Sequence, residues 1–251
     1  MGTGQLKKSI DKLEVLYESP DYVAVMKPAG LATIPGRAES DSVLERLGRQ
    51  INLPVTGSAD PRLRIVHRLD KDTSGVLLMA KHKAAQRHAS EQFQNNFAKK
   101  EYLALVHGRP PADSGHIDEP LAVHPTVKTR MCITKHGRPA VTDWVVEQQF
   151  RVGTLLRVFP KTGKTHQIRV HLAHVGLPLW IDPIYGSSGA IYLSKIKRAY
   201  RPSAHEERPL IERLTLHAHR LTFKIMDGST LTIEAPLPKD YRSAVNQLAK
   251  L

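Results

Sequence analysis

The sequence contains very little cysteine and no long apolar run. Cys132 is the only cysteine in 251 residues, which excludes an internal disulfide framework and any zinc module built on several cysteines. The longest strongly apolar run, residues 76–80, is far too short to cross a bilayer. The first 15 residues contain no apolar core of signal-peptide length. We therefore expect a cytoplasmic protein that does not enter a membrane.

Acidic residues are scarce relative to basic ones. Lys and Arg number 37 against 24 Asp and Glu, for a formal net charge of +13, which indicates a polyanionic partner. The basic residues are spread along the chain without forming a lysine-rich amphipathic helix, so nucleic acid is favoured over an anionic membrane. No Ser/Gly-rich linker divides the sequence. We predict a tail over residues 1–12 and one domain over residues 13–251, acting as a monomer.

Hairpin patterns dominate, and the strand–helix alternation of a parallel sheet is missing. Alternating apolar residues predict a hairpin through Ser19-Pro20-Asp21, and Asp227-Gly228 predicts another through a type I′ turn. Further strands are expected at 75–81, 99–111, 140–150 and 154–160, and helices after a cap at Asp41 or Ser42, over 83–96 and after a cap at Asp240. The predicted class is α+β, with a mostly antiparallel mixed sheet flanked by helices and loops.

The stretch "IVHRLDKDTSG", residues 65–75, places carboxylates beside cations between two apolar runs. It could be a plain connection between strands, because Asp72-Thr73-Ser74-Gly75 supplies turn residues. Alternatively, Asp70 is a carboxylate kept ionised for chemistry, because Arg68 and Lys71 stabilise its charged form. The spacing alone leaves both interpretations open.

A second dense stretch, "KTGKTHQIRVHLAHVGLP", covers residues 161–178. A nucleotide-binding P-loop would need a glycine where Val158 stands, so we expect no nucleotide cofactor. The histidines do not have HExxH spacing and no acidic residue lies within the stretch, so we expect no metal. The pattern predicts a helix capped by Thr165 that presents basic residues at its surface, namely Lys164, His166, Arg169 and His171. An ordinary basic surface helix would have the same pattern.

"HRLDKDTSG", the tyrosine of "KKEYLALVHG", "TGKTHQIRVHLAHVGLPLWIDPIYG" and "LHAHRLTF" occur in this order in one basic chain. Together they closely resemble the RluA-like family of pseudouridine synthases, from about Leu13 to Pro238. The resemblance implies the pseudouridine synthase catalytic fold. It also implies isomerisation of uridine to pseudouridine in ribosomal or transfer RNA, by base flipping and without a cofactor.

The resemblance also implies roles for individual residues. Asp70 matches the essential carboxylate, Tyr102 the tyrosine that stacks on the target base, and Lys164 a position where the family usually has an arginine paired with that carboxylate. Asp72 is assigned to the turn. The predicted substrate-binding residues, some of which resemble family positions at the flipped base or the opened RNA, are Arg68, Thr165, His166, Ile168 and Arg169. His67, His166 and His217 receive no catalytic role.

Residues 187–213 form an insertion that is longer than a connection in a compact domain usually is. It contains Lys195, Lys197, Arg198 and Arg201, with Tyr192 and Tyr200 between them, so it could grip RNA or be a solvated excursion. For the whole chain, the alternative to an enzyme is a non-catalytic RNA-binding or RNA-folding protein that keeps the fold. A nucleoside glycosidase would want a second catalytic carboxylate, and only Asp72 is near.

Overall fold

The computed structural model describes residues 12–36, 41–197, 200–201 and 206–251. The chain divides into two compact units. Unit 1 comprises residues 1–99 and 220–235, and unit 2 comprises residues 100–219 and 236–251. Strand β11 (Leu216–Lys224) contributes its first four residues to unit 2 and the remainder to unit 1. The predicted tail falls almost entirely on residues 1–11, outside the described residues.

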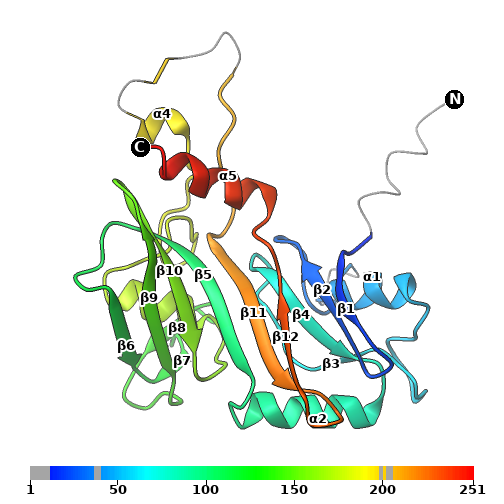
Figure 1. Cartoon of the computed structure of the whole chain (residues 1–251). Helices are drawn as coiled ribbons and strands as arrows, with labels where there is room; N and C mark the ends of the chain where they lie inside the picture. The colour runs from blue at the N-terminus through cyan, green and yellow to red at the C-terminus, as the bar shows by residue number, and fades with distance from the viewer. Residues whose placement is uncertain (1–11, 37–40, 198–199, 202–205) are drawn as a thin grey trace, which may run out of the picture. The chain divides into compact units, whose positions relative to one another are not determined.

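Unit 1 is built from antiparallel strands and two helices (Figure 1). Its elements are β1 (Val15–Glu18), β2 (Tyr22–Lys27), α1 (Val43–Gln50), β3 (Arg64–Ile65), β4 (Ser74–Ala80), α2 (Lys83–Gln94) and β12 (Thr230–Glu234). β2 pairs with β1 and β4, β3 pairs with β4, and β12 pairs with β11. Each of these pairings is antiparallel.

The core of unit 1 contains apolar side chains of β2, β4, α2 and the β11–β12 hairpin. All seven residues of β4 are buried, as the continuous apolar run predicted. Ala85 and Ala89 of α2 pack into the same cluster as Tyr22 and Leu78. The predicted cap of α1 is confirmed, because the Ser42 side chain accepts a hydrogen bond from the Glu45 backbone N–H at 3.2 Å.

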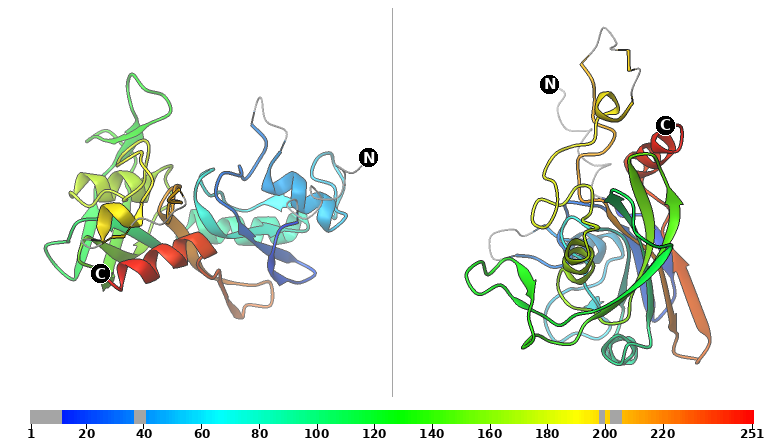
Figure 2. Two further views of the ribbon diagram at one scale, coloured as in Figure 1. Left: turned by 90° about the horizontal axis from the view of Figure 1, so that it is seen from above. Right: turned by 90° about the vertical axis from the view of Figure 1, so that its left-hand side faces the viewer.

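The strands of unit 2 pair antiparallel in the order β5–β10–β9–β6. Its elements are β5 (Lys99–His107, of which Lys99 belongs to unit 1), β6 (Ser114–Asp118), β7 (Leu121–Val123), β8 (Met131–Ile133), β9 (Val141–Gln149), β10 (Gly153–Pro160), α3 (Gln167–His174), α4 (Leu193–Ile196) and α5 (Lys239–Leu248). β7 and β8 form a separate antiparallel hairpin. Figure 2 shows this hairpin, in green, projecting from the unit.

Alternation along β5 gives unit 2 two cores, one on each face of its sheet. Leu103 and Leu105 share a cluster with Tyr241 and Leu248, so α5 covers one face. Ala104 and Val106 share a cluster with Ile168 and Leu172 instead, so α3 covers the other. The expected α+β class with a mostly antiparallel sheet is confirmed.

Two local predictions were wrong. The hairpin between β11 and β12 does not have a type I′ turn, which would require a positive φ at two successive residues. Asp227 has no positive φ, whereas Gly228 has φ +85°, and the Gly228 N–H donates to the Ile225 carbonyl at 2.9 Å. This is a turn closed by a left-handed glycine. The second error concerns α5, whose cap position is Pro238; Asp240 lies in the first turn and pairs with Arg213.

Candidate active site

Asp70 lies in the loop of unit 1 that joins β3 to β4, and its side chain is half-buried. The Thr73 N–H donates to the Asp70 carbonyl at 3.1 Å and closes a turn over residues 70–73. Thr33 fixes the preceding residue from the other side, because its Oγ1 donates to the Leu69 carbonyl at 2.9 Å. The backbone on both sides of Asp70 is therefore held by other parts of the unit. Asp72 is exposed within the turn, as predicted.

A buried lysine supports the same turn. The Lys27 side chain is fully buried, and its Nζ donates to the Lys71 carbonyl at 2.7 Å and to the Pro28 carbonyl at 2.9 Å. The Gly30 N–H donates to the Lys71 carbonyl as well, at 3.0 Å, and Gly30 has φ +81°, which glycine adopts readily. The segment 27–30 thus acts as a brace under the Asp70 turn.

The histidine of the first motif has a structural role. His67 Nε2 accepts the Leu78 backbone N–H at 3.0 Å, and its ring stacks on Phe93 with centroids 4.5 Å apart. Arg68, by contrast, is exposed. The first motif therefore combines a fixed carboxylate with an arginine that solvent can reach.

In unit 2, Tyr102 lies on β5, where it pairs with Val158 of β10. Its half-buried ring packs against the cluster on the α3 face, which also contains Ile168. The structure thus brings Tyr102 and Ile168, two of the predicted site residues, into one apolar cluster. Ile168 is 6% exposed, so most of its surface is used inside the unit.

Lys164 lies in the turn between β10 and α3, and Gln167 builds this turn. Gln167 Oε1 accepts the Lys164 backbone N–H at 3.0 Å and the Thr162 hydroxyl at 2.7 Å. Its Nε2 donates to the Val141 carbonyl at 2.9 Å and to Thr142 Oγ1 at 3.0 Å. One buried amide therefore fixes the position of Lys164 relative to β9. The Lys164 side chain itself is half-buried.

Lys100 completes the turn from β5. Its Nζ donates to the Thr162 carbonyl at 2.9 Å, which ties the strand that carries Tyr102 to the turn that carries Lys164. Burial, followed by the nearby charge of Lys164, lowers the pKa of Lys100 to about 8. Lys100 and Tyr102 are two residues apart on a strand, so both side chains point to the same face. This face of β5 combines an aromatic ring with a cation that loses its proton readily.

α3 does not begin as predicted. Its N-cap position is His166 instead of Thr165, and no side chain caps it. His166 has φ +55°, a left-handed conformation that is uncommon for a residue with a Cβ. His166 Nδ1 lies 2.9 Å from the Tyr185 hydroxyl, so the imidazole is held inside the unit. The exposed Thr165 is left free of a capping role.

The prediction that α3 presents Arg169 and His171 at the surface was also wrong. Arg169 is 5% exposed and makes a two-pronged ion pair with Asp182, with Nε–Oδ2 at 2.8 Å and Nη2–Oδ1 at 2.7 Å. His171 is fully buried between Thr142 Oγ1 and the Glu119 carbonyl, both at 2.9 Å, and burial lowers its pKa. Arg169 and His171 therefore make hydrogen bonds and an ion pair inside unit 2 and are not available at its surface.

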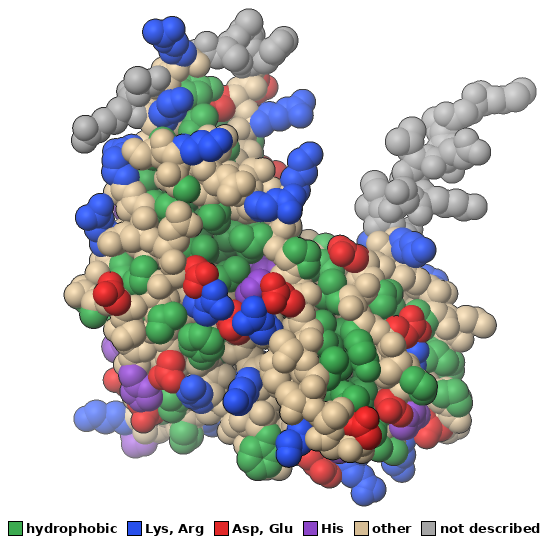
Figure 3. Space-filling view, in the orientation of Figure 1, with side chains coloured by type: hydrophobic (Ala, Val, Ile, Leu, Met, Phe, Trp, Pro, Cys, Tyr) green, Lys and Arg blue, Asp and Glu red, His purple; other side chains and the backbone are tan. Residues whose placement is uncertain are grey.

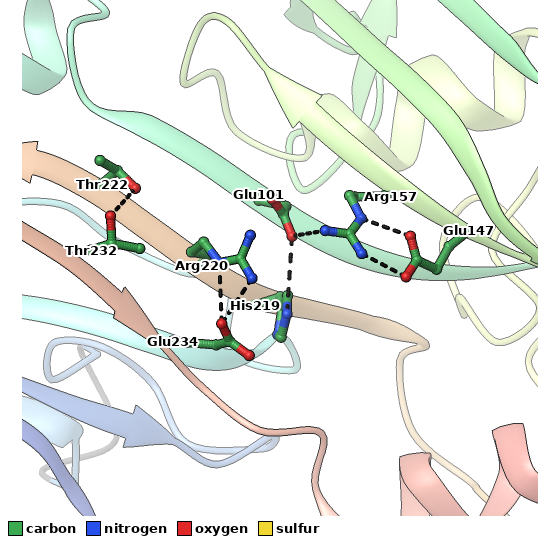
Figure 4. A network of polar contacts seen from close by, with 8 residues as sticks. All are labelled: Glu101, Glu147, Arg157, His219, Arg220, Thr222, Thr232 and Glu234. Atoms are coloured by element: carbon green, nitrogen blue, oxygen red, sulfur yellow. Dashed lines mark hydrogen bonds and ion pairs between the residues drawn. The ribbon is translucent and has the colours of Figure 1, made fainter.

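The other face of β5 carries an ion network (Figure 4). Arg157 donates to Glu147 through Nε at 2.8 Å and to Glu101 through Nη1 at 2.9 Å. His219 Nε2 lies 4.0 Å from the same Glu101 carboxylate. Glu101 stands between Lys100 and Tyr102 in the sequence, so the alternation of the strand separates the acidic network from the lysine and the tyrosine.

Comparison with known proteins identifies these motifs. Residues 21–174 match the family model described as RNA pseudouridylate synthase. Ribosomal large subunit pseudouridine synthase D of Nitrosomonas europaea is 38% identical over 240 residues, covering 95% of this chain and 66% of that protein. The protein of the same name from Escherichia coli K12 is 35% identical and is covered over 68% of its length. This chain thus spans about two thirds of the length of these relatives. The chain belongs to the RNA pseudouridylate synthase family.

Solved structures agree with this assignment. Human RNA Pseudouridylate Synthase Domain Containing 1 has a TM-score of 0.69 and 27% identity, with 95% of this chain and 87% of that chain covered. Human RNA Pseudouridylate Synthase Domain Containing 4 shares the fold with the same TM-score. The pseudouridine synthase fold implied by the sequence motifs is therefore confirmed. The family match includes Asp70, Tyr102 and Lys164 within one continuous region.

Sequence reasoning missed the residues that hold the pseudouridine synthase motifs in place. Lys100 could have been found, because a lysine two positions before a strand tyrosine must share its face. Gln167 and Asp182 gave no such signal, because their partners lie in other elements.

Part of the insertion packs against unit 2. Ile196 of α4 is 8% exposed and packs into the cluster of α5, and Ile191 pairs with Ile211 at the base of the segment. Lys195, Lys197 and Arg201 are exposed, whereas Arg198 lies outside the described residues. Lys and Arg side chains gather over the segment around α4 (Figure 3). Their charges are therefore accessible to a polyanion.

Within the part of the chain that the structure covers, no three His, Cys, Asp or Glu side chains are grouped so that they could hold a metal ion. Among the same residues, no helix has the length and apolar character that crossing a membrane requires.

Proposed function

We propose that this chain isomerises specific uridines of ribosomal RNA to pseudouridine. The family match and the printed names of the relatives, which concern the ribosomal large subunit, support ribosomal RNA over transfer RNA. The excess of basic residues fits a polyanionic substrate. Nothing favours the alternative of a non-catalytic RNA-binding protein.

The observation that carries the proposal is the setting of Asp70. Thr73 holds its backbone carbonyl, Thr33 holds the backbone of the preceding Leu69, and its side chain stays partly open to solvent. Isomerisation breaks the bond between ribose C1′ and the base N1, turns the base, and joins C1′ to the base C5, whose proton then leaves. A carboxylate serves this reaction as a nucleophile at C1′ or as a base on the sugar. With the target base flipped out of the stack, Asp70 is the group we assign to the glycosidic bond.

The remaining site residues take roles around the flipped base. Tyr102 offers an aromatic face for stacking, and Lys164 supplies a positive charge at the position where the family usually has an arginine. Arg68 is exposed, as an RNA contact requires. Ile168 belongs to the apolar cluster against which Tyr102 packs. We withdraw Arg169 from the substrate-binding set because Asp182 occupies its guanidinium, and we give Thr165 and His166 the task of shaping the turn.

We further propose that residues 13–251 act as one catalytic domain in the cytoplasm, where ribosomal RNA is modified. A monomer suffices for this proposal, because every residue assigned here belongs to one chain.

Pseudouridine mapping tests the substrate. Ribosomal and transfer RNA from cells with and without this gene are compared by chemical mapping of pseudouridine. We expect one or a few ribosomal RNA positions to lose the modification, and to regain it when purified protein is added to the unmodified RNA. Loss at transfer RNA positions alone would overturn the choice of substrate while leaving the reaction intact.

A further inference from the structure

Tyr185 is a half-buried residue of unit 2 that contacts several elements and that the proposed reaction does not use. Its hydroxyl accepts the Met131 backbone N–H at 2.7 Å and lies 2.9 Å from His166 Nδ1. Two guanidinium groups lie over its ring, with Cζ of Arg169 5.2 Å and Cζ of Arg130 5.6 Å from the ring centroid. Burial raises the pKa of Tyr185, so the phenol keeps its proton and can donate it to His166.

Met131 and Arg130 connect Tyr185 to the β7–β8 hairpin. Arg130 also donates through Nη2 to the Ile184 carbonyl at 2.7 Å, and Met131 packs beside Tyr185 in the cluster of Val170. The hairpin and the residues that follow it, 121–138, carry no acidic residue. Their exposed cations are Lys128, Arg130, Lys135 and Arg138. A surface of this charge attracts the phosphates of RNA.

Tyr185 also contacts His166, which follows the turn that carries Lys164. His166 is the left-handed residue at which the turn ends and α3 begins. A non-glycine residue in this conformation persists only where its surroundings fix it, and the Tyr185 hydroxyl contacts the imidazole of His166. Two residues earlier, the Lys164 N–H is held by Gln167 of the same helix. Movement of His166 would therefore move Lys164.

We propose that Tyr185 is a positioning residue for the isomerisation. It links the β7–β8 hairpin to the start of α3. Binding of RNA phosphates to the hairpin therefore fixes the conformation of the turn that carries Lys164. This inference rests on the proposed function, because it assigns a task within that same reaction. Its prediction is that the Tyr185 hydroxyl acts through Lys164 and not through RNA affinity.

The first test removes only the hydroxyl. In Tyr185→Phe the aromatic ring beside the two arginines is kept, while the hydrogen bonds of the hydroxyl to His166 and Met131 are lost. We expect kcat for tritium release from 5-tritiated uridine in ribosomal RNA to fall about tenfold, the effect of losing one well-placed hydrogen bond. Binding of RNA should stay within about twofold of wild type, because the exposed cations of the hairpin remain.

Tyr22→Phe is the matched control. Tyr22 belongs to the core of unit 1 and its hydroxyl lies 2.9 Å from His88 Nδ1, so this change also breaks a partly buried tyrosine–histidine contact. Because both contacts are partly buried, the two variants should lose similar thermal stability, but Tyr22→Phe should keep the wild-type kcat. Equal kcat losses in the two variants would mean that only general stability matters, and the positioning role would be rejected.

A double-mutant cycle decides the route of the effect. If Tyr185 acts through Lys164, then Tyr185→Phe should lower single-turnover rates by less than about twofold in a Lys164→Ala background, although it lowers them about tenfold in wild type. A tenfold loss in both backgrounds contradicts the inference, as does a wild-type rate in Tyr185→Phe. An inactive wild-type protein would instead refute the proposed function.

Discussion

Lys100 shows how much a single side chain of the site depends on its surroundings. It donates to the Thr162 carbonyl and stands near Lys164, and burial together with that neighbour lowers its pKa to about 8. An unfolded lysine keeps its proton up to about pH 10.4. Between these values the unfolded chain binds a proton that the folded chain lacks, so folding stability rises with pH in this window.

This sign gives a prediction for Lys100→Met. Below pH 8 the wild type carries a buried charge that the variant lacks, and near pH 10 the folded wild type is neutral at this position. The stability of the variant relative to wild type should therefore be highest at pH 7 and decline as the pH approaches 10. Urea unfolding at both pH values measures this difference. A difference that does not change with pH would show that Lys100 titrates normally in the folded protein.

Lys164 gives a second prediction at this scale. Lys164→Arg should have a mild effect or raise the rate, because it restores the planar cation that the family usually places beside its carboxylate. Lys164→Ala should cost about 2–4 kcal/mol of transition-state stabilisation. Steady-state rates of both variants, with RNA affinity measured alongside, test the assignment. An alanine variant as active as wild type would remove Lys164 from the catalytic set.

The residues that the sequence predicted best are those whose neighbours in the chain define them. Asp72 belongs to the turn, and His67 has a structural contact, as expected. Arg169 was placed on the surface because its partner, Asp182, comes 13 residues later, beyond the end of the helix. Helical spacing shows which residues share a face, but it does not show which face a buried ion pair occupies.

Elements were predicted well where one physical pattern acted alone. The apolar run of β4, the amphipathic α2 and the Ser42 cap of α1 all appear as expected. The start of α3 was missed because Thr165 is a good capping residue by type. The tertiary contact between His166 and Tyr185 overrides that preference, and the helix begins one residue later than predicted.

The segment around α4 gives a prediction at the scale of an element. Replacing Lys195, Lys197 and Arg201 with alanine should weaken RNA binding and flatten the log–log dependence of affinity on salt by about two to three units, near 0.7–0.9 per lost phosphate contact. Turnover at saturating RNA should stay close to wild type, because phosphate contacts do not select the uridine. Affinity titrations across salt concentrations measure the slope. An unchanged slope would show that the segment is a solvated excursion that does not contact RNA phosphates.

At the scale of the whole chain, class and family followed from the sequence more directly than internal organisation did. Four motifs in one order identified the family, and the hairpin patterns gave the α+β class. The division into two units was not predicted, because β11 belongs to both and no linker marks the boundary at His219. A boundary inside a strand leaves no trace in composition.

The substitution Asp70→Asn tests the central claim most directly, because it removes one negative charge and keeps the shape of the side chain. Tritium release from ribosomal RNA labelled at uridine C5 is measured for both proteins, with thermal unfolding and RNA binding as controls. We expect release by the variant to be abolished while folding and affinity stay near wild type. Release within about tenfold of wild type would contradict the assignment of Asp70 to the glycosidic bond.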